Sequence, residues 1–447
     1  MSAAPAKFVT GSTMRHVLMM TSTGSIGLVA VFMVDALNLF YISRLGQKEL
    51  AAAVGYAGTI LFFFTSIGIG LSIAATALAS RALGRGDRAC ARELSGASLL
   101  VSGLSIGLLA LLVLPFLPWL VQVLGAQGET ARWALRFMHI VLPSMPLLGL
   151  GMSISGLLRA LGDGKRAMYV TLGAGAATAI LDPLFIFGLN MGLDGAAIAN
   201  VLARLVLIGI GSYSLLKVHH FCAWPHKAIF VREYRAYLQI GIPATLTQIA
   251  TPVGNTFVTV AIAKYGDDAV AGWAVIGRLI PVAFGVLFAL SGAVGPILGQ
   301  NFGAKRYDRL YSTMRDSLTV TVGYVLLVWV LLALFSHQIA NAFGAQGQGH
   351  DLIVFFCIFV SGSFIFNGSL FVANAAFNNL GYAFYSTMLN WGRSTLGVIP
   401  FVWLGSHWFG AIGVMAGYGL GVVLFGVASV VLCFRVLRQL EMKGAVG

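Results

Sequence analysis

The sequence has few charged residues, which excludes a water-soluble globular protein. Asp, Glu, Lys and Arg make up only 10% of the 447 residues, whereas 58% are hydrophobic. So little polar surface cannot cover a soluble protein of this size. We therefore expect the chain to lie largely in lipid.

Cysteine is scarce, and signatures of enzymes and metal sites are missing. The four cysteines are Cys90, Cys222, Cys357 and Cys433. They lack metal-ligand spacing and are interpreted as packing residues. The stretch Gly84–Asp87 lacks the strand and helix context of a phosphate loop, and Asp267 with Asp268 has no second acidic cluster to bind Mg²⁺. We expect no enzyme, no metal site and no cofactor other than a coupling ion.

Long apolar runs, in contrast, recur along the whole chain. A bilayer is crossed by about 20 apolar residues, and twelve runs reach that length. The first is too long for a cleavable signal, and no small-residue cleavage site follows it. The predicted spans are 15–43, 50–80, 94–123, 131–159, 166–190, 195–217, 236–263, 269–301, 311–335, 352–379, 384–405 and 409–434. The sequence thus predicts an all-α membrane protein with twelve transmembrane helices.

The basic residues are distributed unevenly about these spans. With the N-terminus inside, 20 of the 28 Lys and Arg residues fall on the cytoplasmic side, five on the opposite side and three within spans. This bias predicts that both termini are cytoplasmic. It also explains the net charge of +13 without a nucleic acid. We expect a multi-pass protein of the inner (plasma) membrane, in contact with the lipid bilayer and without an obligate protein partner.

An internal repeat relates the two halves of the chain. A shift of 219 residues superimposes Leu124–Gly128 on Phe343–Gly347 with four identities in five, and it places Gly84 on Gly303. Several such matches in one order and at nearly one offset indicate a duplication. Six spans separate equivalent positions, so both halves enter the membrane in the same direction. Two six-helix lobes related by a pseudo-two-fold axis along the membrane normal follow.

The repeat predicts three parts of the chain. Residues 1–217 form an N-terminal lobe, 218–235 a cytoplasmic linker and 236–447 a C-terminal lobe. The histidines of the linker are interpreted as solvated loop residues.

Two acids, Asp35 and Asp182, lie deep within predicted spans, and both are in the first half. A carboxylate in hydrocarbon costs at least a few kcal/mol, so an acid kept there usually faces a polar cavity and has a role. Low polarity favours a neutral carboxyl group, and no Lys or Arg lies near Asp35 in its helix. Asn38, three residues on, shares its face and is a candidate hydrogen-bond partner. Asp35 is therefore the predicted proton-binding residue.

Two features near these acids leave alternatives open. The segment Thr21–Gly27 has poor helix propensity, so helix 1 either bends there or uses small residues for close packing. Asp182 precedes Pro183, which is expected to kink helix 5. Its carboxylate either takes part in ion binding or pairs with Arg204 of helix 6.

The second half carries polar stripes in place of acids. Helix 7 has Thr245, Gln248, Asn255 and Thr259, and helix 10 has Asn367, Asn374 and Asn378. Their spacings keep each set on one helical face. Such stripes either hold helices together or line a cavity. We take Gln248, Asn255, Asn374 and Arg204 as candidate cavity residues.

The chain resembles the multidrug and toxic compound extrusion (MATE) family across nearly its full length. The segments that carry the resemblance are Leu45-Gly46 before Leu50–Ala52, Gly84 with Asp87, Gly156–Asp163, Leu181–Gly188 with Gly195-Ala196, and Gly299–Gly303. The resemblance implies export of amphipathic, often cationic compounds, driven by H⁺ or Na⁺ entry.

The acids match the DinF-like branch of that family, which uses an Asp in helix 1 and an Asp in helix 5. Asp35 and Asp182 stand at these places, and Asn200 matches a polar helix 6 position in the same network. Thr178 stands where an Asn is often found, which weakens a Na⁺ site more than a proton site. By resemblance, protonation of Asp35 bends helix 1, shrinks the first-lobe cavity and expels the drug.

Two rival functions remain at this stage. One is Na⁺-coupled drug antiport within the same family. The other is a lipid or oligosaccharide flippase of the same superfamily, which would hold an anionic headgroup with Arg204, Arg278 and Arg393.

Overall fold

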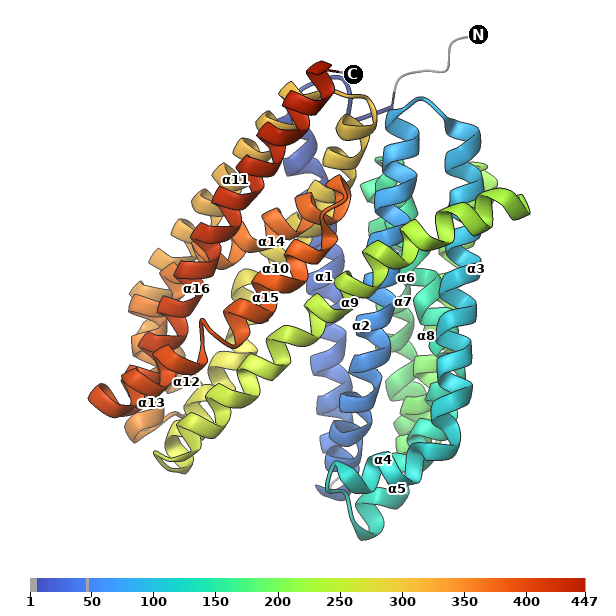
Figure 1. Cartoon of the computed structure of the whole chain (residues 1–447). Coiled ribbons are helices and arrows are strands. Elements are labelled where there is room, and N and C mark those ends of the chain that lie inside the picture. Colours follow the sequence, from blue (N-terminus) through green and yellow to red (C-terminus); the bar gives the residue numbers. More distant parts are fainter. Residues whose placement is uncertain (1–5, 46–47, 447) are drawn as a thin grey trace. The chain divides into compact units, whose positions relative to one another are not determined.

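The structure is a computed structural model of the chain, and it describes residues 6–45 and 48–446. Within these ranges the regular elements are helices, and no strand occurs (Figure 1). Among the residues that the structure describes, eleven helical segments are long and apolar enough to cross a membrane. The last of them, Ala383–Lys443, covers the two predicted spans 384–405 and 409–434, and each of the others matches one predicted span.

The last two spans fall in one range because α16 (Ile399–Val446) comprises two helices that meet at a kink at Gly410. This residue is not helical, with φ 62° and ψ −142°, a conformation that favours glycine. The chain folds back there, and the two arms approach through glycines. A Cβ atom on Gly405 would lie 2.0 Å from the carbonyl oxygen of Gly413. Gly410 is therefore the boundary between the eleventh and twelfth spans.

The chain divides into two compact units, which we name by their place in the sequence. The central unit comprises Ile26–Thr245, and the terminal unit comprises the residues up to Ser25 and those from Leu246 onward. These borders differ from the predicted parts 1–217, 218–235 and 236–447. The first part of α1 packs with the second repeat, and residues 218–245 pack with the first. The division into lobes by span order remains a prediction.

The central unit is built from long helices joined by short turns. Its elements are α1 (Thr13–Ser43) from Ile26 on, α2 (Lys48–Gly84), α3 (Arg88–Val113), η1 (Leu114–Phe116), α4 (Leu117–Val123), α5 (Gly128–Val141), η2 (Leu142–Ser144), α6 (Met145–Ala160), α7 (Gly164–Pro183), η3 (Leu184–Gly188), α8 (Gly192–Ser212) and η4 (Tyr213–Val218). Helix α3 begins before the predicted residue 94 because the Asp87 side chain caps it, accepting from the Cys90 amide at 2.9 Å.

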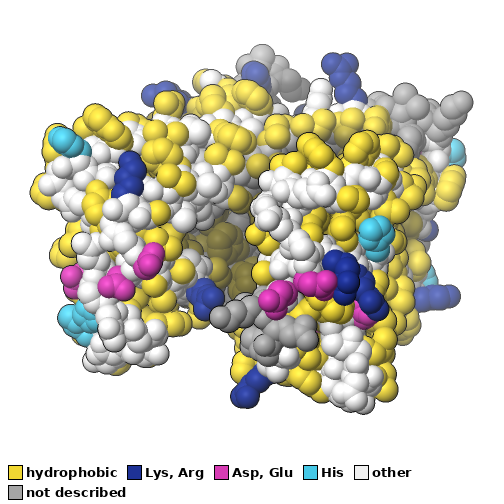
Figure 2. Space-filling view, turned by 90° about the horizontal axis from the view of Figure 1, so that it is seen from below, with side chains coloured by type: hydrophobic (Ala, Val, Ile, Leu, Met, Phe, Trp, Pro, Cys, Tyr) yellow, Lys and Arg dark blue, Asp and Glu magenta, His cyan; other side chains and the backbone are white. Residues whose placement is uncertain are grey.

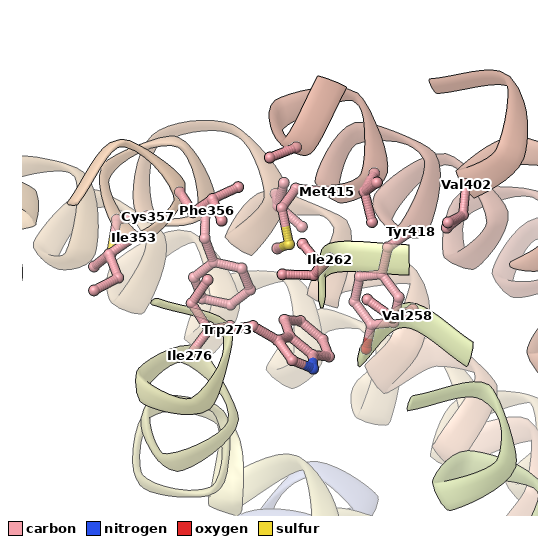
Figure 3. Packing of buried hydrophobic residues seen from close by; sticks show 14 of the residues in the cluster. Val258, Ile262, Trp273, Ile276, Ile353, Phe356, Cys357, Val402, Met415 and Tyr418 are labelled. Carbon is pink, nitrogen blue, oxygen red and sulfur yellow. The ribbon is translucent and has the colours of Figure 1, made fainter. Parts of the chain in front are cut away.

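The terminal unit repeats this order. After α9 (Lys227–Ala263), which belongs to the terminal unit from Leu246 on and to the central unit before it, come α10 (Asp267–Gly303), α11 (Tyr307–Leu334), α12 (Ser336–Ala342), α13 (Gly347–Phe355), η5 (Phe356–Val360), η6 (Ser361–Ser363), α14 (Phe364–Leu380), α15 (Ala383–Ser394) and α16. Its core includes Trp273, whose indole packs edge-on against Tyr418 at 5.8 Å and donates to Thr259 Oγ1 at 2.9 Å (Figure 3).

The outer surface is apolar, as a lipid-facing protein requires. Large hydrophobic side chains stand exposed along α3 and the helices after it, among them Leu104, Leu111, Phe116 and Trp119 at 60% or more. This is the exposure pattern expected of membrane spans. Figure 2, which looks from below onto the ends of the helices, shows Lys, Arg, Asp, Glu and His side chains there among the hydrophobic ones.

Candidate functional site

Helices α1 and α7 pack along matching stripes in the central unit. A Cβ atom on Gly27 would lie 2.5 Å from Thr171 Oγ1, and one on Gly175 would lie 3.4 Å from Val34. One step further along both helices, Asn38 Nδ2 donates to Asp182 Oδ2 at 2.7 Å. The glycines let the backbones approach, and that approach brings the amide of α1 to the carboxylate of α7.

Asp182 is a buried acid with an incomplete set of partners. Its side chain is 1% exposed, and Oδ1 is buried with no hydrogen-bond partner among the described residues. Helix α7 ends at Pro183 and continues as the π-helix η3, so the predicted kink takes the form of a wider helical turn. The backbone of this turn lies against Gly195, where a Cβ atom would be 2.7 Å from the Phe185 carbonyl carbon.

Asp35 is placed differently from Asp182. Its side chain is exposed, and no residue in the described ranges forms a hydrogen bond or ion pair with it. The suggested bond from Asn38 to Asp35 is wrong, because the Asn38 amide points across to Asp182. The two acids are thus linked through α1, with Asp35 three residues before the side chain that binds Asp182.

The other predicted members of this network lie on the neighbouring helices. Thr178 is half-buried, one turn before Asp182, and its hydroxyl donates back to the Ala174 carbonyl at 3.1 Å. Asn200 on α8 is also half-buried. Both stay predictions as ion-binding residues.

Arg204 does not pair with Asp182. The guanidinium is buried, and its Nη1 donates to the Val141 carbonyl at 3.0 Å and to Ser144 Oγ. These contacts tie α8 to the end of α5 and to η2. The ion-pair alternative for Asp182 is therefore excluded in this conformation, and Arg204 is a packing residue in it.

The polar stripe of helix 10 binds helices together. Asn374 is buried and accepts from Asn390 Nδ2 at 3.0 Å, and Asn378 accepts from Ser386 at 3.3 Å. These bonds join α14 to α15. Of the candidate cavity residues in the terminal unit, Asn374 is thus an interhelical contact, whereas Gln248 is half-buried and Asn255 is exposed.

Arg393, near the end of α15, is a buried cation of the same unit. It is 3% exposed, and its Nη2 donates to Thr251 Oγ1 at 2.7 Å, while its Nε has no hydrogen-bond partner among the described residues. No carboxylate in the described ranges forms an ion pair with it. Arg278, in contrast, is exposed, and Arg204 belongs to the other unit.

Sequence reasoning left open that small residues of Thr21–Gly27 serve close packing, and Gly27 does so, but it missed the partners Thr171 and Gly175 on α7. Gly27, Thr171 and Gly175 carry no charge, and glycine is common in this chain, which has 55 of them. The only available signal was the spacing of glycines on helices 1 and 5, and it does not name a partner.

Comparison with known proteins identifies the family to which the chain belongs. A sequence model of the MatE family matches residues 25–184 and 243–404, one segment in each repeat. The chain belongs to the MATE family. Members of this family are transporters and not enzymes. The DinF-like branch remains a prediction.

Three relatives show how far the likeness extends. This MATE protein is 27% identical to a protein named FAD transporter of Shewanella oneidensis, with 96% of each chain covered. It is 24% identical to the multidrug export protein MepA of Staphylococcus aureus, over 93% of this chain and 92% of MepA. The D35N mutant of the Vibrio cholerae MATE transporter VcmN superposes with a TM-score of 0.92 at 25% identity, covering 96% of this chain and 98% of that one. The predicted fold of twelve helices in two lobes is confirmed.

Proposed function

We propose that this MATE protein is an H⁺-coupled exporter of amphipathic, often cationic compounds, with Asp35 as the proton-binding residue. The observation that carries the proposal is the pair of acids on α1 and α7, joined through Asn38 and paired with no cation in the described residues. A carboxyl group without a counter-charge in a membrane protein alternates easily between its charged and neutral forms.

In this proposal the two acids have different tasks. Asp35 is exposed and exchanges protons with water that enters the protein. Its charge changes the balance of interactions on α1, which carries the Asn38 amide held by Asp182. Protonation bends α1 near Thr21–Gly27 and closes the cavity of the first lobe, and deprotonation on the cytoplasmic side resets it. The hydroxyls of Ser22 and Ser25 already bond back to the α1 backbone, at 2.7 and 2.8 Å, which favours bending there.

The substrate class and the membrane follow from the relatives and the charge distribution. MepA is named a multidrug export protein, and it covers nearly the whole chain. The excess of Lys and Arg in one set of loops supports cytoplasmic termini and insertion in the plasma membrane. No cofactor other than the coupling ion is part of the proposal.

Reconstituted vesicles test the coupling ion directly. Purified protein is placed in liposomes with a fluorescent cationic dye, and H⁺ and Na⁺ gradients are imposed one at a time. The proposal expects dye transport with the H⁺ gradient alone. Transport that needs Na⁺ and ignores the H⁺ gradient would establish the Na⁺-coupled alternative.

A second candidate is transport of an anionic substrate such as a dinucleotide or a lipid headgroup. It is favoured by the full-length similarity to a protein named FAD transporter and by Arg393, a buried cation without a carboxylate partner among the described residues. The same vesicles loaded with FAD decide between the two. Protein-dependent FAD flux that is lost in Arg393→Met would support this candidate, and dye transport without FAD flux would exclude it.

A further inference from the structure

The chain before α1 is docked on the terminal unit by its backbone. We call residues 6–12 the N-terminal arm. Phe8 of the arm is fully buried, in an apolar cluster with Val17, Leu298 and Leu310, and its ring packs edge-on against His16 at 5.2 Å. A terminal segment usually frays unless something holds it. Here a large side chain anchors it.

A polar clamp holds the arm around that anchor. Gln300 Oε1 accepts from the Phe8 amide at 2.8 Å, and Asn301 Nδ2 donates to the Phe8 carbonyl at 3.2 Å. Both amide side chains are at most 1% exposed. We call Gln300, Asn301 and Arg309 the arm clamp.

Arg309 makes the densest contacts of the clamp. Its Nη2 donates to the carbonyls of Phe8 at 2.8 Å and Thr10 at 3.3 Å, and its Nη1 donates to the carbonyl of Gly11 at 2.8 Å. Its Nε donates to Asn301 Oδ1 at 2.9 Å, which fixes the guanidinium plane. One side chain thus binds three backbone carbonyl oxygens of the arm, an arrangement that suits the planar donors of arginine and not those of lysine.

The clamp explains a sequence motif that the proton site does not use. Gln300 and Asn301 lie in Gly299–Gly303, one of the segments that carry the family resemblance. In the structure this segment ends α10 and binds the arm, which is nearly 300 residues earlier in the chain.

Helix α1 is held in two regions, and the docked arm holds the first of them. Residues up to Ser25 belong to the terminal unit, where Thr13 Oγ1 donates to Asp316 Oδ2 and Gly24 lies against Ala289. From Ile26 on, α1 belongs to the central unit and carries Asp35 and Asn38. One continuous helix is therefore fastened to the terminal unit at its start and to α7 further on.

We propose that the arm clamp is a positioning site for transport: it fastens the start of α1 to the terminal unit, so that a change of charge at Asp35 is converted into work on both units. This inference rests on the proposed role of Asp35. If the arm is loose, the start of α1 can move independently of the terminal unit. Proton binding at Asp35 then no longer drives substrate transport.

The test compares Arg309→Ala with Arg306→Ala in the full-length protein. Arg306 lies three residues away, is exposed and pairs with Asp308 without touching the arm, so it is a matched control for loss of charge. In proteoliposomes we expect Arg309→Ala to lower H⁺-driven dye transport about fivefold or more, with dye affinity within about twofold of the wild type. Arg306→Ala is expected to transport normally. Normal transport by Arg309→Ala overturns the proposal.

A rescue experiment separates positioning from folding. In a variant with all four cysteines replaced by Ser, Thr13→Cys and Asp316→Cys are placed where the wild-type side chains are hydrogen-bonded. We expect the disulfide to restore transport to Arg309→Ala and reduction to abolish it again. If transport stays low although the disulfide forms and the protein is folded, positioning of α1 is not the role of the clamp. Should Arg309→Ala fold poorly, Gln300→Ala with the same disulfide pair gives the same comparison.

Asp35→Asn in the same vesicles distinguishes this inference from the proposed function. Full activity of Asp35→Asn rejects the proton site itself. An inactive Asp35→Asn beside a fully active Arg309→Ala rejects only the clamp.

Discussion

The turn at 124–128 in the central unit and the turn at 343–347 in the terminal unit have nearly the same backbone. Gln127 lies at φ −133° and ψ 161°, and Gln346 at φ −128° and ψ 163°, each followed by a glycine with positive φ. The interiors differ: among the described residues the central unit has a buried acid, Asp182, in addition to buried Arg204, whereas the buried charged residue of the terminal unit is Arg393. The duplication kept the turns that direct helices into the membrane, while a buried acid is found in the central unit alone among the described residues.

Asp35→Asn should have the largest effect on transport, and it tests whether proton binding is confined to the central unit. Asn cannot release a proton, so we expect H⁺-driven dye transport to fall to the level of empty liposomes while the protein stays folded. Asp351→Asn, an exposed acid of the terminal unit, is the matched control and should transport normally. Residual transport above about a tenth of the wild-type rate, which is a rise of less than about 1.4 kcal/mol in the barrier, would mean that proton binding is not confined to the central unit.

Loss of the Asn38 amide should have the next largest effect. In Asn38→Ala, Asp182 loses the one donor that its carboxylate has among the described residues, and a buried acceptor left unpaired costs about 1–3 kcal/mol. We expect a lower Tm and slower transport. Adding Asp182→Asn removes the buried charge and should recover part of the Tm. Strictly additive losses would show that the two side chains act independently.

Glycine packing in the terminal unit gives a smaller effect, on stability alone. A Cβ atom on Gly421 would lie 1.6 Å from the Gly397 carbonyl oxygen, so Gly421→Ala forces the backbone apart, at about 2–3 kcal/mol. Gly209 of α8, on the equivalent helix of the central unit, has no atom within 4 Å of that position. Gly209→Ala should therefore raise the Tm or leave it unchanged, as measured by thermal unfolding in detergent. Equal losses in both variants would contradict the packing difference.

The smallest expected effect comes from comparing the N-terminal arm, which precedes the first repeat, with the linker 218–235, which precedes the second. The arm is held by a buried clamp, and the linker by buried Phe221 and by His219, whose Nε2 lies 2.8 Å from Asp163 Oδ2 with the side chain 23% exposed, so the prediction of solvated histidines is wrong for His219. The contact between His226 Nδ1 and Glu93, at 3.0 Å, in contrast has an imidazole that is 79% exposed. We expect His226→Ala to shift the Tm by no more than about 2 °C. A larger shift would show that the linker is anchored as firmly as the arm.

Much of the fold could be predicted from the sequence, because apolar length and punctuating glycines mark each span. Gly410 illustrates this, because its non-helical backbone separates the two predicted spans that meet within α16. The unit borders could not be predicted. They depend on which repeat the ends of α1 and α9 contact, and no periodicity within a helix reports that.

The site was predictable where a single residue carries the signal. An acid inside a span is conspicuous, so Asp35 and Asp182 were found. The partner of Asn38 was not, because spacing along one helix identifies neighbours on that helix only. The partner of Gln300 lies 292 residues away, and a backbone amide leaves no mark in the sequence.

The packing of the first part of α1 on the terminal unit also sets an order of assembly. Residues up to Ser25 leave the ribosome well before α10, α11 and the later helices, which form the surface that receives them. The terminal unit is therefore complete only when this segment meets helices made much later, a long-range closure that is expected to be slow. An affinity tag fused before residue 6 would interfere with that closing step, and a tag after α16 is the safer choice for purification.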